Sequence, residues 1–445
     1  MIKSRQEQLQ LICEVENKLL QLESSNIDLF PVIRAYIFYS YKPIFDQKKP
    51  KRSIVQWLGL LYQFVLSFFR LLVLCIKPIK SDYLLVASSL QRNSLNKTVW
   101  ISKHLDSLIR HYGKHNCTVI EIGKSKPGVN SPYLNLTKAV RGISKLVISI
   151  LPKNKVLSKL ALDSVRAVKA IDPNANMNAQ WLENELNVFC IATKIYKLVF
   201  TRSHFKMGVW VAYYDFEMMA MINALNSRGV KTVDYQHGIQ NDFHALYSGW
   251  EALPKRPNCM PTTFFVWDKI TEQRILKWGE LIGVTAEITG NFWLRLILPT
   301  SNAGKELDSK KSLNEVLVAL QHWPEDFNEE LLEVIKNKPQ LNWCFRAHPF
   351  APISEHDNNR ICAQYPNIRF ETNEARTLEE ALSSCTLCIT GYSTVGIEAL
   401  HFGKTTIYTH VNALDGLTSY IDNKVCYFAR EANELESIVT SVFDN

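Results

Sequence analysis

Short apolar runs alternate with longer helix-like stretches from Asp82 onward. The run Tyr83–Ala87 is continuously apolar, which is typical of a parallel strand buried on both faces. Further strand-like runs occur at 118–120, 198–200, 232–233, 264–266 and 287–289, and helices are expected over about 176–195, 208–227 and 270–280. Strand and helix alternating in this way predict a doubly wound α/β domain.

The chain becomes polar and loop-like over residues 300–313, which we interpret as an interdomain linker. The alternation then restarts, with strands expected at 316–321, 343–347, 387–390 and 405–409. The sequence therefore predicts two α/β domains, at 81–300 and 312–445. Ligands of such sheets bind at the carboxyl ends of the strands, so we expect a cleft between the facing strand ends.

Residues 1–80 form a helical extension in this prediction. Leu9, Ile12, Val15, Leu19 and Leu22 recur at three or four residues, an amphipathic stripe. This stripe favours a helix packed on the main body over a helix that binds a partner.

The segment 54–79 is apolar and long enough to span a membrane, but polar residues interrupt it. Gln56, Gln63 and Arg70 are separated by sevens and share one helical face, which a lipid-surrounded helix would not tolerate. Lysines flank both ends. Two interpretations stay open: an in-plane helix on an anionic inner leaflet, giving a peripheral membrane contact, and a long helix buried against a domain.

Composition excludes several classes of protein. With 47% hydrophobic and 21% charged residues, the chain is neither disordered, nor collagen-like, nor a multi-span membrane protein. A net charge of +8 over 445 residues is too weak to indicate nucleic acid. The 10 cysteines are scattered and the N-terminus lacks a signal-peptide layout, so we expect reduced thiols in a cytoplasmic protein.

The first cluster with chemical potential is Val233–Asp242, at the end of a predicted strand. His237 can act as general base or hold a phosphate oxygen, and Asp234 or Asp242 can act as base, nucleophile or orienting carboxylate. The alternative is a structural histidine with satisfied hydrogen bonds. The clustering of Gln236, His237, Gly238 and two aspartates at a strand end favours function.

Two further clusters follow strands of the second domain. Arg346 and His348 share a face by alternation, and Pro349 ends the strand. Ser393 or Thr394 stands where a helix N-cap is expected, with Glu398 one turn inside, so the turn suits a phosphate. A plain capping box is the alternative for this third cluster.

Several common signatures are missing from the sequence. It contains no P-loop, no G-x-G-x-x-G after the first strand, no G-x-S-x-G and no Asp-x-Asp at a strand end. Cys385 and Cys388 form one C-x-x-C without a second pair at zinc spacing. We therefore expect a reaction that uses neither a metal nor a cofactor.

Over about residues 82–430, these motifs resemble the two-domain GT-B type glycosyltransferases of bacterial surface-polysaccharide assembly, which make capsule and lipopolysaccharide O-antigen. The resemblance implies two Rossmann-like domains, the first for the acceptor and the second for the nucleotide sugar. Arg346-Ala347-His348-Pro349 resembles the HP motif of bacterial sialyltransferases and Kdo transferases, which use CMP-activated sugars. Ser393-Thr394 resembles their phosphate-holding hydroxyl pair.

The resemblance implies transfer of a sugar, with CMP-Kdo or a similar CMP-ulosonic acid as donor, to a lipid-linked or oligosaccharide acceptor. It makes His237, Asp234 and Asp242 the catalytic candidates. The donor-binding candidates are Gln321, Arg346, His348, Pro349, Ser393, Thr394, Glu398 and Asn291. The acceptor-binding candidates are Arg92, Asn93, Lys97, Trp100 and Gln236.

Three rival functions share this architecture. The first is a CDP-glycerol or CDP-ribitol phosphotransferase, whose product carries a phosphodiester. The second is a UDP-sugar 2-epimerase, which needs no acceptor. The third is a non-catalytic scaffold of a polysaccharide assembly complex, which would bind no nucleotide.

Overall fold

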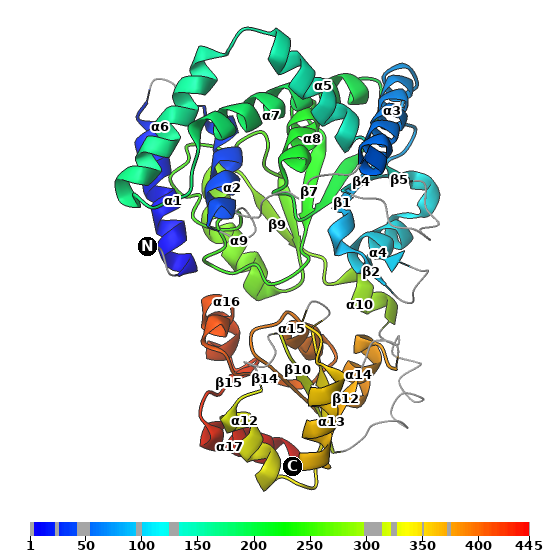
Figure 1. Ribbon diagram of the computed structural model, residues 1–445, viewed down its shortest axis with the longest axis vertical. Coiled ribbons are helices and arrows are strands. Elements are labelled where there is room, and N and C mark those ends of the chain that lie inside the picture. The colour runs from blue at the N-terminus through cyan, green and yellow to red at the C-terminus, as the bar shows by residue number, and fades with distance from the viewer. Residues whose placement is uncertain are drawn as a thin grey trace. The chain divides into compact units, whose positions relative to one another are not determined.

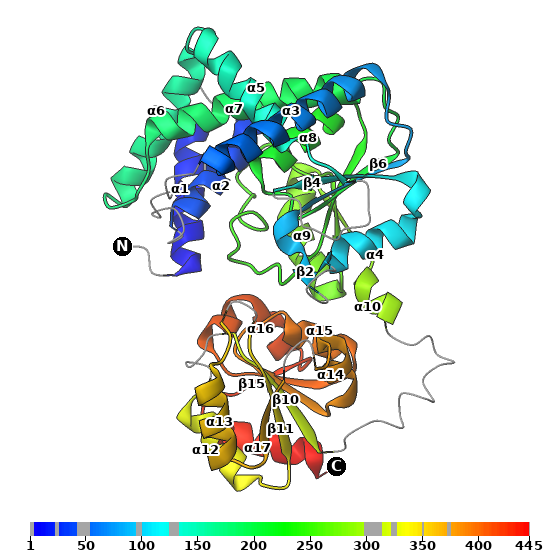
Figure 2. The ribbon, with the colours of Figure 1, turned by 45° about the vertical axis from the view of Figure 1, so that its right-hand side comes forward.

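The computed structural model describes residues 4–22, 26–41, 54–94, 100–123, 133–297, 314–321, 327–348, 351–371 and 375–444. The chain divides into two compact units, Met1–Phe292 and Trp293–Asn445 (Figures 1 and 2). Each unit is built on one parallel sheet. The linker predicted at 300–313 lies outside the described residues.

The N-terminal unit contains a seven-stranded sheet in the order β5-β4-β1-β6-β7-β8-β9, with every pairing parallel. The direction of chain progression reverses between β1 and β6, which is the topological switch point of a doubly wound sheet. The strands are β1 Tyr83–Ser88, β4 Cys117–Ile122, β5 Tyr133–Leu134, β6 Met207–Val211, β7 Lys231–Tyr235, β8 Thr263–Val266 and β9 Thr285–Ile288.

Helices follow most of these strands along the chain, and a two-stranded antiparallel ribbon comes after β1 in the sequence. The helices are α4 Lys103–Tyr112, α5 Thr137–Ile150, α6 Lys155–Ile171, α7 Ala179–Phe200, α8 Phe216–Asn226 and α9 Lys269–Ile282, and α10 Phe292–Ile297 begins at the last residue of the unit. The ribbon consists of β2 Asn93–Ser94 and β3 Trp100–Ile101.

Two predictions for this unit are wrong, and the short strands β2, β3 and β5 were not predicted. Residues 198–200, expected as a strand, are the last turn of the 22-residue helix α7. The true strand is β6, whose five residues are all buried and which was expected to begin a helix. A short, fully buried strand lacks the alternation that distinguishes it from a buried helix.

The N-terminal helices belong to the first unit. They are α1 Arg5–Leu20, α2 Phe30–Ser40 and α3 Ile54–Ile76. Ser4 caps α1 through a capping box with Glu7, and the apolar stripe of α1 enters the same core as the sheet residues Leu84 and Ile120. As the apolar stripe predicted, α1 packs on the main body, and the helices of the extension predicted over 1–80 complete the core of this unit.

Arg34 ties α2 to the loop after β7. Its side chain is 0% exposed. Its guanidinium forms an ion pair with Glu16, donates to the carbonyls of Ala245 (2.9 Å), Ser248 (2.7 Å) and Gly249 (2.6 Å), and lies 3.6 Å from the ring centre of Trp250. A buried charge with this many partners fixes the loop relative to the helices.

Helix α3 packs one face on α5 and α7, where Ser67 and Leu71 are buried. Its opposite face is exposed and apolar. Within the described ranges, no helix is both long and apolar enough to cross a membrane.

The C-terminal unit contains a six-stranded parallel sheet in the order β12-β11-β10-β13-β14-β15. The strands are β10 Glu315–Ala319, β11 Asn342–Arg346, β12 Ile368–Glu371, β13 Leu387–Thr390, β14 Thr405–Tyr408 and β15 Tyr427–Phe428. The helices are α12 Glu329–Asn337, α13 Glu355–Gln364, α14 Leu378–Ser384, α15 Val395–His401, α16 Leu414–Asp422 and α17 Ala432–Phe443.

Numbered within the unit, this order is 3-2-1-4-5-6, the order of a Rossmann domain. The prediction of two doubly wound, Rossmann-like domains is confirmed. The four strands predicted here correspond to β10, β11, β13 and β14, and β12 and β15 were not predicted.

Candidate functional site

In the C-terminal unit, the switch point lies between the carboxyl ends of β10 and β13. One side-chain hydrogen bond links the two strand ends. Gln321 follows β10, and its Oε1 atom accepts from the backbone N–H of Tyr392, which follows β13, at 3.1 Å. Beneath this hydrogen bond, the Thr390 hydroxyl donates to the Ala319 carbonyl at 2.7 Å. Open α/β sheets bind their ligands at this position, so Gln321 lies where the sequence analysis expected a donor contact.

The turn after β13 leads into α15 without a side-chain cap. Thr394 occupies the N-cap position but makes no cap hydrogen bond, and the Ser393 hydroxyl accepts from the Val395 N–H at 3.3 Å. The capping-box alternative is therefore wrong for this turn. A Cβ at Gly396 would lie 2.2 Å from the Tyr408 hydroxyl, so only glycine lets α15 pack this closely on β14.

Two histidines lie at the same edge of the C-terminal sheet. His410, after β14, has its ring 5.1 Å from the Tyr392 ring, and its Nδ1 accepts from the Asn412 N–H at 3.1 Å. With Nδ1 as acceptor, a neutral ring carries its proton on Nε2 and can donate from there. His348 follows β11 and is partly buried. Pro349 lies outside the described residues, and Glu398 is partly buried on α15.

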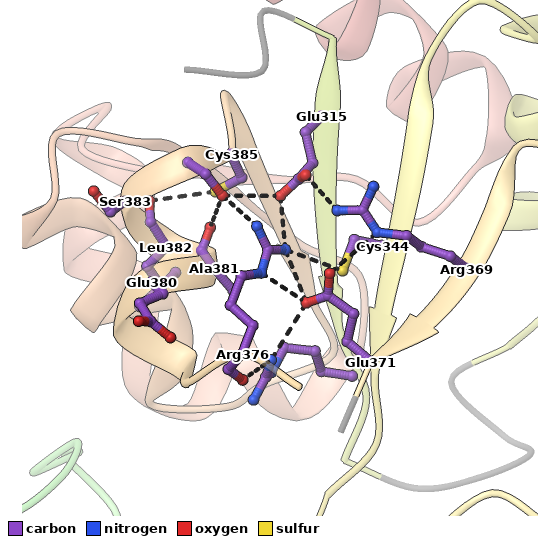
Figure 3. A network of polar contacts seen from close by, with 12 residues as sticks. Glu315, Cys344, Arg369, Glu371, Arg376, Glu380, Ala381, Leu382, Ser383 and Cys385 are labelled. Carbon is purple, nitrogen blue, oxygen red and sulfur yellow. Dashed lines mark hydrogen bonds and ion pairs between the residues drawn. The ribbon is translucent and has the colours of Figure 1, made fainter. Parts of the chain in front are cut away.

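Arg346 is buried and contacts the ion-pair cluster of Glu315, Arg369, Glu371 and Arg376 on the sheet, which Figure 3 shows. Its Nη1 donates to the Arg376 carbonyl at 2.8 Å and lies 3.4 Å from a Glu371 oxygen. Figure 3 shows Arg376 between Glu315 and Glu371, at 2.9 and 2.8 Å, and Arg369 also pairs with Glu315. Arg346 and His348 were predicted to share a face at the end of β11. Of these two, Arg346 is engaged by Glu371 and by the Arg376 carbonyl within the unit.

The N-terminal sheet places Asp234 beneath its carboxyl edge. Asp234 is 0% exposed. Its carboxyl group accepts hydrogen bonds from the Tyr213 backbone N–H and from the Tyr247 hydroxyl, both at 2.9 Å. Burial raises the pKa of Asp234 to about 8, against the opposing effect of these hydrogen bonds. It holds the turn after β6, where Ala212 has a φ of 63°. A group enclosed in this way is not placed to attack a substrate.

Gln236 and Asp242 also have internal partners. The Gln236 amide donates to the Gly238 carbonyl at 3.0 Å, and its oxygen accepts from the Trp267 N–H at 2.7 Å. Gln236 therefore joins the ends of β7 and β8. Asp242 is 43% exposed in its side chain and lies 3.4 Å from Arg274.

His237 lies beside a second histidine that the sequence analysis missed. The ring centres of His104 and His237 are 6.4 Å apart, and Nδ1 of each ring is buried without a hydrogen-bond partner among the described residues. Burial lowers the pKa of His237 to about 4 and that of His104 to about 3. Both rings are therefore neutral at pH 7. Two aromatic rings lie next to them. The Tyr214 ring centre is 6.3 Å from that of His237, and the Trp267 ring centre is 6.3 Å from that of His104.

The remaining acceptor candidates lie around the β2–β3 ribbon. Arg92 is 4% exposed, forms an ion pair with Glu121 and donates to the Trp100 carbonyl at 3.3 Å. Asn93 pairs with Ile101 in the ribbon, and Lys97 lies outside the described residues. The donor candidate Asn291 follows β9 in the N-terminal unit and is 3% exposed.

The residues that sequence reasoning missed are His104, Trp267, Tyr392 and His410. Trp267, Tyr392 and His410 each follow a strand within two residues, so their position in the chain was a usable signal. His104 starts a helix, and only the fold brings it to His237. In the described part of the chain, no group of three His, Cys, Asp or Glu side chains could hold a metal ion.

Neither a protein-family model nor a curated protein sequence matches this chain. Among solved structures, it is similar to the UDP-GlcNAc 2-epimerase of Methanocaldococcus jannaschii, at 10% identity over 82% of this chain and 93% of that one, with a TM-score of 0.45. The UDP-GlcNAc 2-epimerase of Neisseria meningitidis bound to UDP-GlcNAc matches at 12% identity over 81% and 91%, with a TM-score of 0.46.

A UDP-glucosyltransferase of Polygonum tinctorium matches at 10% identity over 82% of this chain and 90% of that one, with a TM-score of 0.43. At such identities and TM-scores, these likenesses assign neither an activity nor a substrate to this chain.

Proposed function

We propose that this chain is a nucleotide-sugar enzyme whose C-terminal unit binds the nucleotide at the switch point between β10 and β13. The observation that carries the proposal is the turn after β13, where Tyr392 is held by Gln321 and Thr394 keeps a hydroxyl that does not cap its helix. Backbone N–H groups and hydroxyls at a strand end suit a phosphate. The Tyr392 and His410 rings offer a surface for a base or sugar.

In this proposal the candidate acid–base group is His237 of the N-terminal unit. Burial lowers its pKa to about 4, so the ring is neutral at pH 7 and its Nδ1 is a hydrogen-bond acceptor and a weak base. The proposal requires that the substrate reach this buried atom. His104 lies beside His237, with the two ring centres 6.4 Å apart, and so packs against the loop that carries His237.

Two reactions fit this assignment. In glycosyl transfer, the bond between the anomeric carbon and the phosphate oxygen breaks, its electron pair leaves with the nucleotide, and an acceptor hydroxyl bonds the anomeric carbon while its proton passes to the base. In 2-epimerisation of a UDP-sugar, a base removes the proton at C2 while the bond between C1 and the phosphate oxygen breaks and its electron pair leaves with UDP. UDP then adds back to C1, and a proton is delivered to the opposite face of C2.

The epimerase has one structural observation in its favour. Arg92 and Gln236, both predicted to contact an acceptor, are engaged with Glu121 and with Trp267 and Gly238. An isomerase needs no acceptor, so its activity does not require these two side chains to be available. A CMP-ulosonic donor, a capsule or O-antigen product and a lipid-linked acceptor stay predictions, because no described contact selects them.

Nucleotide binding is the first test. We expect a raised melting temperature with at least one of CMP, CDP, UDP, GDP and TDP, since ligand at 100 times Kd adds about 2.7 kcal/mol to the free energy of unfolding. Thr394→Val should weaken the binding of that nucleotide about tenfold, because one hydrogen bond to a charged group is lost. Thr440→Val, on α17, is the matched control and should bind as wild type. Silence from all five nucleotides would favour the scaffold.

Turnover separates the enzymes. UDP-GlcNAc alone in D₂O should give a 2-epimer carrying deuterium at C2 if the chain is an epimerase, whereas a transferase should consume the donor only with a hydroxyl acceptor. A phosphodiester product would identify the phosphotransferase. His237→Gln should lower turnover at least about a hundredfold and keep the nucleotide-induced shift. Unchanged turnover would remove His237 from the chemistry.

A further inference from the structure

The exposed face of α3 is a continuous apolar stripe. Eight large side chains of this helix are between 38% and 73% exposed: Leu61, Tyr62, Val65, Leu66, Phe69, Leu72, Val73 and Ile76. At about 100° per residue they all fall within an arc of about 140° centred near Phe69. The buried residues Ser67 and Leu71 lie on the opposite side, against α5 and α7. The stripe is therefore surplus to the packing of the unit.

Helix α5 extends this apolar surface. A Cβ at Gly142 would lie 2.4 Å from the Phe64 ring of α3, so the two helices touch there. Leu146 and Ile150 follow Gly142 at intervals of four and share its side of α5, and they are 60% and 73% exposed. Leu151 adds 57% exposure just after the helix. Figure 2 shows α3 running along α5 and α7, so the two helices that carry these exposed side chains are neighbours.

The two helices and the residues that flank them in the sequence carry charges of one sign only. Residues 47–81 and 122–162, which include both helices, contain no Asp or Glu. Arg70, Lys77 and Lys80 are exposed in and after α3, and Lys145 and Lys153 are exposed in and after α5. Apolar side chains bordered by cations match the boundary between the acyl region and anionic headgroups.

We propose that α3 and α5 form one docking face for an anionic lipid bilayer, with the apolar stripe inserted and the basic residues at the headgroups. A second copy of the chain is the other conceivable occupant, but an isologous contact would bring two identical basic, acid-free surfaces together. The bilayer is favoured by this complementarity of charge. The proposal stands independently of the reaction proposed above, because it uses no residue of either sheet edge.

The test is sedimentation of the full-length protein with vesicles of phosphatidylcholine containing roughly 30% phosphatidylglycerol, or with phosphatidylcholine alone. We expect binding to the anionic vesicles, weakened at high salt. The double variant Phe69→Ser/Ile76→Ser should bind at least about tenfold more weakly, because each side chain loses its buried apolar area. Leu281→Ser, at a residue 63% exposed on α9, is the matched control and should bind as wild type.

A second variant tests the charge. Lys145→Gln/Lys153→Gln should weaken binding to anionic vesicles about thirtyfold, as expected for two cations near the surface that contribute about 1 kcal/mol each. Equal binding by the Phe69→Ser/Ile76→Ser variant, or equal binding to neutral and anionic vesicles, would overturn the proposal. So would self-association in place of vesicle binding, abolished by the same variant, because the face would then belong to a second copy.

Discussion

Replacement of Arg34 by methionine should destabilise the N-terminal unit strongly. Methionine keeps the length and apolar stem of the side chain but removes the guanidinium that pairs with Glu16 and donates to three carbonyls. Breaking one partner of a buried ion pair costs about 3–5 kcal/mol. Each carbonyl left buried without a donor adds about 1–3 kcal/mol unless water reaches it. We therefore expect a loss of at least about 4 kcal/mol in the free energy of unfolding.

Urea unfolding of the full-length protein measures this loss, and hydrogen–deuterium exchange assigns it to the unit. Peptides covering α1 and residues 245–250 should exchange faster, whereas peptides of β10 and β13 should not change. Lys231→Met is the matched control, since its side chain is 41% exposed and pairs at 2.6 Å with Glu287, whose side chain is 48% exposed. An exposed pair of this kind contributes at most about 1 kcal/mol.

The pH dependence gives a second readout of the same variant. Burial raises the pKa of Glu16 even beside Arg34, and removing the guanidinium raises it further. The ionised carboxylate becomes costlier in the folded state as pH rises above its ordinary range, so the stability gap between wild type and Arg34→Met should widen from pH 5 to pH 8. A loss below about 1 kcal/mol, or a gap independent of pH, would refute the assignment of Arg34 as the anchor of this loop.

Three further outcomes follow from the packing. Gly396→Ala should lower the free energy of unfolding by about 1–3 kcal/mol in thermal melts, because its Cβ would meet the Tyr408 hydroxyl at 2.2 Å; wild-type stability would contradict this contact. Asp234→Asn should gain in melting temperature relative to wild type between pH 5 and pH 8, because a carboxyl whose pKa is raised from 3.8 to about 8 makes folding proton-dependent in that range; parallel pH profiles would count against the buried carboxyl. Arg376→Met should cost about 3 kcal/mol in urea unfolding by leaving two carboxylates without their shared cation, and a neutral effect would show that Arg369 suffices.

The architecture could be predicted from the sequence because most strands are apolar runs between helices. The exceptions have a common cause. Residues 198–200 are rich in strand-forming side chains, yet they continue a long helix, and β6 is buried on both faces and so lacks the period of two. Local pattern cannot decide between the two states when burial is complete.

The strand-end positions of the candidate residues could be predicted from the sequence, whereas their contacts could not. Gln321, Thr394 and His237 lie at strand ends, as the order of motifs implied. The partners that occupy Arg346 are Glu371 and Arg376, 25 and 30 residues further along the chain, and no local pattern signals such a pairing. Asp234 is likewise engaged by Tyr247, thirteen residues away.

The loop from His237 to Trp250 owes its conformation to both sides of the N-terminal unit. From the sheet, Asp234 receives the Tyr247 hydroxyl, and from the helices, Arg34 binds the carbonyls at 245, 248 and 249. A proton-transfer group works best on a loop that does not reorganise during the reaction. The N-terminal helices are therefore part of the machinery that positions His237, so a boundary drawn at residue 80 would cut through the support of the candidate base.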